Sequence, residues 1–159
     1  VGDSLIVHGG ILPSHLNILG GLNGLNQRVW LWLTNQSALP QELFDNDSPI
    51  WTRFYSNPDS RELSDEAIKS LDEVLLKTGT KRMIVGHTPQ QMGINHAAGG
   101  KVWRIDTAMC AMMGGKPEVL EILGNEISVI TEAHKLPAAK RKARPRIANV
   151  EGKKNSNSE

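Results

Sequence analysis

The sequence predicts a mixed α+β fold, and three observations carry this prediction. Short runs rich in β-branched residues at Ser4–Val7 and 81–85 have the length and composition of buried strands. A segment at 65–77 repeats its apolar residues with the 3.6-residue period of a helix. Two apolar runs at 118–122 and 127–130 flank a Gly-Asn pair, a pattern that indicates a β-hairpin.

Two helices are expected from the spacing of apolar side chains. The first covers 22–33, with Asn23 as a candidate N-cap residue and Trp30 packed in the core. The second begins at Ser64, whose hydroxyl group suits an N-cap, and ends at Gly79, which suits the left-handed conformation that often follows a helix. We expect its inward face to consist of Ile68, Leu71, Val74 and Leu75.

The remaining chain divides into a third strand, loops and a tail. A strand is expected over 101–106, and 90–100 reads as a glycine-containing loop. Residues 135–159 carry eight basic and two acidic side chains, whereas 1–134 carry ten basic and fifteen acidic ones. The absence of hydrophobic periodicity in 135–159 predicts a basic disordered tail following a domain at 1–134.

Composition excludes several classes of protein. No apolar run reaches the roughly 18 residues needed to span a membrane. The single cysteine excludes an internal disulfide and a cysteine-based zinc knuckle. The basic tail lacks aromatic residues and regular spacing, so we expect no nucleic-acid binding. These features are those of an intracellular protein, without indicating a compartment.

Two strands end in a histidine that is adjacent to glycine. His8 follows Ser4–Val7 and is succeeded by Gly9, and His87 follows 81–85 directly after Gly86. Neutral imidazole is the commonest protein ligand for first-row metal ions. The two histidines therefore predict a shared metal site at the mouth of a sheet.

The motifs around these histidines carry a family resemblance. The run His8-Gly9-Gly10 resembles the His-Gly-Gly motif of calcineurin-like metallophosphoesterases in their phosphoprotein phosphatase branch. The segment 51–53 resembles the one that bears their phosphate-binding arginine, and 86–90 resembles their last metal-binding histidine motif. The run 104–122 is similar to the C-terminal part of the Shewanella-like protein phosphatases.

The resemblance implies a fold, a chemistry and a role for each site residue. The fold would be the C-terminal portion of a β-sandwich flanked by helices, an incomplete domain. His8 and His87 would ligate metal, and Arg53 would bind the phosphate of a phosphorylated protein. Apart from the resemblance, Asp106 lies at the end of a predicted strand near the site, where it would orient a metal-bound histidine or form a turn. Two divalent ions (manganese, iron or zinc) would supply a metal-bound hydroxide for phosphomonoester hydrolysis.

The sequence also departs from the family. Its first three motifs, Gly-Asp-x-His-Gly, Gly-Asp-x-x-Asp-Arg-Gly and Gly-Asn-His-Glu, are absent, so only part of the ligand set is present. Pro89 excludes a Gly-His-x-His pair. We therefore expect a fragment with at most half of the metal site, inactive when alone. An unseen ligand or a partner chain is what could complete the site. His15 and His96 are expected to be exposed loop residues.

Two other functions remain open at this point. A dinucleotide polyphosphate hydrolase of the same superfamily shares the His-Gly-Gly and Gly-His-Thr motifs. A non-catalytic remnant or binding module would explain the missing ligands. The similarity of 101–122 to the phosphatases favours a phosphatase.

Overall fold

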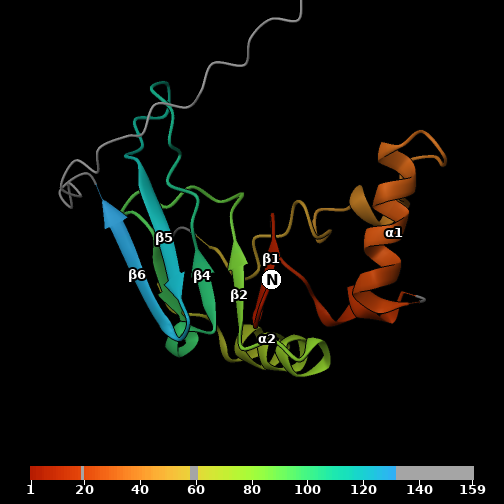
Figure 1. Cartoon of the computed structure of the whole chain (residues 1–159), viewed down its shortest axis with the longest axis horizontal. Helices are drawn as coiled ribbons and strands as arrows, with labels where there is room; N and C mark the ends of the chain where they lie inside the picture. Colours follow the sequence, from red (N-terminus) through yellow and green to blue (C-terminus); the bar gives the residue numbers. More distant parts are fainter. Residues whose placement is uncertain (19, 58–60, 132–159) are drawn as a thin grey trace, which may run out of the picture.

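The computed structural model describes residues 1–18, 20–57 and 61–131. The predicted basic tail at 135–159 lies outside these residues. Within them, a four-stranded sheet and a two-stranded hairpin are accompanied by two α-helices (Figure 1). None of the described helices is long and apolar enough to cross a membrane.

The four-stranded sheet has the order β1-β2-β4-β3. Its strands are β1 (Ser4–Val7), β2 (Arg82–Val85), β4 (Val102–Arg104) and β3 (Asn95–Ala97). β1, β2 and β4 are parallel, and β3 pairs antiparallel with β4. All four residues of β2 are buried, as expected for a strand with a neighbour on each side.

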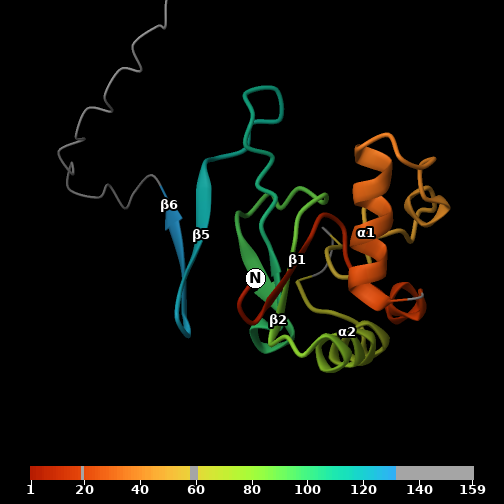
Figure 2. The ribbon, with the colours of Figure 1, turned by 45° about the vertical axis from the view of Figure 1, so that its right-hand side comes forward.

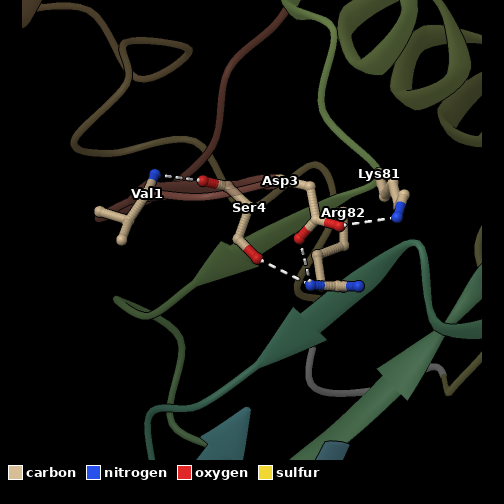
Figure 3. Close-up of polar contacts among 5 residues, drawn as sticks. All are labelled: Val1, Asp3, Ser4, Lys81 and Arg82. Carbon is tan, nitrogen blue, oxygen red and sulfur yellow. Dashed lines mark hydrogen bonds and ion pairs between the residues drawn. The ribbon is translucent and has the colours of Figure 1, made fainter. Parts of the chain in front are cut away.

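A polar cluster fixes the start of β1 against the start of β2. Arg82 Nη1 donates to Asp3 Oδ1 at 2.9 Å and to Ser4 Oγ at 3.0 Å, and Lys81 Nζ lies 2.9 Å from Asp3 Oδ2 (Figure 3). The hydrogen bond from Lys81 holds the pKa of Asp3 below its ordinary value. These bonds join the two strands in the register that pairs Ser4 with Arg82.

Helix α2 (Asp65–Thr78) supplies much of the core beside this sheet. The Ser64 hydroxyl oxygen accepts from Ala67 N at 3.2 Å, and Gly79 ends the helix in the left-handed conformation, as the sequence predicts. Leu71 and Val74 are fully buried and belong to the same cluster as Met83 of β2. The second helix was therefore predicted almost to the residue.

Helix α1 (Gly21–Leu33) differs from its prediction in two respects. Its N-cap residue is Gly20, not Asn23, and no side chain caps it. Trp30 is 57% exposed, so the prediction that it packs in the core is wrong. The physical reason is the position of α1, which rests on the 3-10 helix η1 (Pro13–Asn17) beside the sheet rather than on the sheet's face (Figure 1).

The hairpin consists of β5 (Glu118–Leu123) and β6 (Glu126–Thr131), paired antiparallel as predicted. Figures 1 and 2 agree in placing it on the side of the sheet opposite α1. The predicted loop at 90–100 contains β3 and a 3-10 turn, η3 (Ala98–Gly100). Asn95–Ala97 has little strand propensity, so its pairing with β4 determines its conformation.

Candidate active site

The parallel pairing of β1 and β2 brings His8 and His87 together. Val7 pairs with Val85, so both strands end at the same edge of the sheet. Gly86 N donates to His8 O at 2.8 Å, which extends the pairing one step beyond the strands. The imidazole rings of His8 and His87 consequently lie with their centroids 5.0 Å apart.

The backbone at His87 is held in an unusual conformation. Its φ is 65°, in the left-handed region that residues other than glycine rarely adopt. Thr88 is buried and anchors the turn, because its Oγ1 accepts from Ser56 Oγ at 2.8 Å and its carbonyl accepts from Gln90 Nε2 at 2.8 Å. A strained backbone that the surroundings hold in place is typical of functional sites.

The two glycines after His8 allow the segment 49–53 to approach closely. Gly9 N donates to Pro49 O at 2.8 Å, and a Cβ atom on Gly9 would lie 2.8 Å from Ile50 O and 2.9 Å from Thr52 O. No side chain fits at this position. The glycines thus place the segment that carries Arg53 directly beside His8.

Trp51 and Arg53 both act on His87. The Trp51 ring meets the His87 ring edge-on, with centroids 5.2 Å apart and planes at 86°. The exposed guanidinium of Arg53 helps to lower the pKa of His87. The sequence predicted Arg53 as a site residue but gave Trp51 no role of its own; its position two residues before Arg53 was the only available signal.

Burial lowers the pKa of His87 more than any other cause, and the positive charge of Arg53 and the neighbouring His8 lower it further. Asp106 acts in the opposite direction. The net effect favours neutral imidazole, which is the form that binds metal ions. Within the described residues, His87 Nε2 is buried and has no hydrogen-bond partner.

Asp106 is placed close enough for its charge to act on His87. Its Oδ1 accepts from Ala108 N at 2.8 Å, and its carbonyl oxygen accepts from Gln90 N at 2.7 Å. Asp106 therefore forms a turn and also contributes negative charge near the histidine pair. The turn is one of the two roles that the sequence offered, and the orientation of a metal-bound histidine stays a prediction.

Tyr55 joins the site to the core, a role that the sequence did not indicate. Its hydroxyl group donates to Ile11 O at 3.0 Å and lies 2.8 Å from Ser70 Oγ on α2. Burial raises the pKa of Tyr55 to about 12, so the hydroxyl group stays protonated and able to donate. The segment 52–56 is thereby fixed between the His-Gly-Gly turn and helix α2.

The described residues fit a pair of metal ligands but not a complete metal centre. The closely spaced imidazoles and the partnerless His87 Nε2 are suited to binding a metal ion. However, the described residues contain no group of three or more histidine, cysteine, aspartate or glutamate side chains that could hold a metal ion. A catalytic metal ion usually has at least three protein ligands.

Comparison with solved structures defines the class of fold. The chain matches a cold-active protein-tyrosine phosphatase of a psychrophilic Shewanella species with a TM-score of 0.61 and 23% identity. A second structure of a cold-active protein tyrosine phosphatase, at 1.1 Å, gives a TM-score of 0.60. The match covers 81% of this chain and 39–40% of theirs. The fold of this chain is therefore that of part of these solved structures.

Sequence comparison then adds a named relative. The chain is 37% identical over 128 residues to Shewanella-like protein phosphatase 2 of Arabidopsis thaliana, covering 77% of this chain and 31% of that protein. It is 31% identical over 133 residues to an uncharacterised protein of Acanthamoeba polyphaga mimivirus, covering 67% and 53%. No family model matches the chain. Over the matched residues the chain is similar to a Shewanella-like protein phosphatase. It spans about a third to a half of the length of these two relatives.

Proposed function

We propose that this chain provides metal-binding and phosphate-binding residues of a metal-dependent phosphoprotein phosphatase. The observation that carries the proposal is the meeting of His8, His87 and the Arg53 segment at one edge of the sheet. The lack of a hydrogen-bond partner for His87 Nε2 among the described residues supports it further. The remaining metal ligands would come from outside the described residues, in the same polypeptide or in a partner chain.

Each residue has a distinct part in this site. His8 and His87 would hold divalent metal, which supplies Lewis acidity at the phosphoryl group when bound. The planar guanidinium of Arg53 would bind two oxygen atoms of the substrate's phosphate and orient it for in-line displacement. Trp51 restricts the rotation of the His87 ring, and the pKa of His87, lowered chiefly by burial, favours a metal-binding imidazole.

One alternative has an observation in its favour. The lack of a three-ligand group in the described residues fits a non-catalytic binding module. The dinucleotide polyphosphate hydrolase has less support, because the characterised proteins that the chain resembles are named phosphatases. The binding module does not account for the strained backbone of His87, which holds a buried nitrogen without a partner among the described residues next to a second imidazole.

A chimaera tests the proposal. Residues 1–131 replace the matching segment of the Arabidopsis relative, and manganese-dependent hydrolysis is measured on phosphoseryl, phosphothreonyl and phosphotyrosyl peptides and on a dinucleotide polyphosphate. We expect peptide hydrolysis that is lost in His8→Ala and His87→Ala and reduced in Arg53→Ala. His96→Ala, a histidine at the other end of the sheet, serves as the control.

Two results would contradict the proposal. A folded chimaera without peptide hydrolysis would favour the binding module, and preferential cleavage of the dinucleotide would favour the other hydrolase. The 159-residue chain by itself is expected to hydrolyse no more phosphopeptide than its own His87→Ala variant. Activity well above that variant would show that the chain completes its site without further ligands.

A further inference from the structure

A second cavity lies at the end of the sheet opposite the histidine pair. Its volume is about 400 Å³, and its walls come from the starts of β2 and β4, the turn at Gly99 and Gly100, and the hairpin. Arg82 at this end and His87 at the other are five residues apart along the same segment, roughly 16 Å at about 3.3 Å per residue. The cavity is therefore separate from the candidate active site.

The charge on the walls of this cavity has one sign. Lys81, Arg82 and Lys101 line it, and no aspartate or glutamate of the described part of the chain does. The carboxylates that pair with these cations, Asp3 and Asp72, lie outside the lining. His96 and the amide of Asn125 add further groups able to donate hydrogen bonds.

Arg82 and Trp103 at this cavity each have N–H groups that donate to no acceptor among the described residues. Arg82 uses Nη1 for both Asp3 and Ser4, and Figure 3 shows the other end of its guanidinium pointing away from these two residues. Trp103 Nε1 is buried and has no acceptor within the described part of the chain. Buried donors normally have an acceptor, so an absent ligand is a physical explanation for the Trp103 indole.

The turn above the indole leaves room for such a ligand. Gly100 has a φ of 85°, and a Cβ atom placed on it would lie 3.8 Å from Trp103 Nε1. Gly99 is also left-handed, with nothing within 4 Å of its Cβ position. Gly100 thus brings its backbone close to the indole nitrogen, and neither glycine places a side chain over the cavity.

We propose that this cavity binds a phosphate-class oxyanion, as a site distinct from the candidate active site. The walls offer ammonium, guanidinium and indole donors but no carboxylate, a combination that suits a compact anion with several acceptor oxygens. A metal cation is disfavoured by the same charges. The oxyanion has two sources, free inorganic phosphate or the phosphate of a phosphorylated side chain, which share this chemistry.

The indole N–H group of Trp103 provides a direct readout. The chain has four tryptophans, so a ¹⁵N-labelled sample of all 159 residues gives four indole signals, and Trp103→Phe assigns the one in question. Inorganic phosphate is titrated at constant ionic strength. We expect a saturable shift of the Trp103 signal. The affinity for phosphate obtained from this shift should be several-fold weaker in Lys101→Gln.

A matched lysine controls for general electrostatics. Lys101 and Lys77 are 47% and 46% exposed, and each pairs with one carboxylate at 2.7 Å, but only Lys101 lines the cavity. Lys77→Gln should therefore leave the affinity unchanged. Arg53→Ala and His87→Ala should also leave it unchanged, which separates this site from the proposed phosphatase function.

Three results would overturn the proposal: a Trp103 signal that does not move, a shift that does not saturate, or equal weakening by Lys77→Gln and Lys101→Gln. The first of these results includes a shift confined to the Trp51 signal, which would assign phosphate binding to the candidate active site alone. A parallel titration with a phosphoseryl peptide identifies the source. Tighter binding of the peptide indicates a phosphorylated side chain, and equal or tighter binding of inorganic phosphate indicates the free ion.

Discussion

Helices α1 and α2 have similar lengths but very different surroundings. α2 buries Ala67, Leu71, Val74 and Leu75, and a serine caps its first turn. α1 buries only Leu25 and has no side-chain cap, although its sequence is the more apolar of the two. Leu33 of α1 is 66% exposed, whereas Leu71 of α2 is fully buried.

The difference in burial between the two helices distinguishes α2, which belongs to the core of the described structure, from α1, which contributes little to it. Buried residues of α2, β2 and β4 form one cluster, which β1 packs against and to which α1 contributes only Leu25 among its buried residues. This cluster supports the segments that carry His8, Arg53 and His87. An apolar helix that leaves Trp30 and Leu33 exposed has the composition of a helix covered on several sides. The candidate active site thus belongs to the self-supporting part of the described structure.

The largest effect on stability is expected from Leu71→Ala in α2. Removing a fully buried leucine side chain leaves a cavity and should lower the free energy of unfolding by about 2–5 kcal/mol. Urea denaturation followed by circular dichroism measures it. Leu76→Ala on the same helix, where the side chain is 83% exposed, is the control and should change stability little. Equal losses in both variants would refute the assigned core.

The cap of α2 should have a smaller effect. Ser64→Ala removes the acceptor for Ala67 N and should cost about 1 kcal/mol of unfolding free energy. Ser64→Asp keeps an acceptor at the same position and should retain most of the stability. If Ser64→Asp were as unstable as Ser64→Ala, the cap would not be the cause.

Leu33→Ala in α1 is the direct counterpart of Leu71→Ala. Because this side chain is mostly exposed, its removal should change the unfolding free energy by no more than about 0.5 kcal/mol. The same urea titration compares the two variants. A loss comparable to that of Leu71→Ala would mean that α1 is covered in solution and that the contrast between the helices is wrong.

The segment beneath α1 should respond to pH. His15 was predicted to be exposed, but it is half-buried and its Nδ1 accepts from Leu12 N at 3.0 Å. Burial lowers its pKa, so the unfolded chain binds the proton more readily than the folded chain does. Stability should therefore fall as the pH drops below about 6.5, the ordinary histidine value.

His15→Ala should reduce this loss. Unfolding is compared at pH 7.5 and 5 for the wild type and the variant. Part of the loss should persist in the variant, because the pKa of His87 is also lowered. An identical difference in stability between the two pH values in both proteins would exclude His15 as a contributor.

The sequence predicted the helices and strands whose capping residues and apolar patterns agree with the way they pack. Ser64 and Gly79 marked the ends of α2, and the strands that end at His8 and His87 were recognisable from their β-branched runs. It missed what depends on distant neighbours. β3 exists because of its pairing with β4, Trp30 is exposed because of where α1 rests, and Trp51 faces His87 because Gly9 admits the segment 49–53.

The central claim is that His8 and His87 form a metal-ligand pair, and manganese binding to the 159-residue chain tests it most directly. Isothermal titration calorimetry is performed on the wild type, His8→Ala, His87→Ala and the control His96→Ala. The account predicts weak binding of one ion in the wild type and in His96→Ala, with no binding in the other two variants. Binding that survives in His8→Ala or His87→Ala, or its absence from the wild type, would contradict the account.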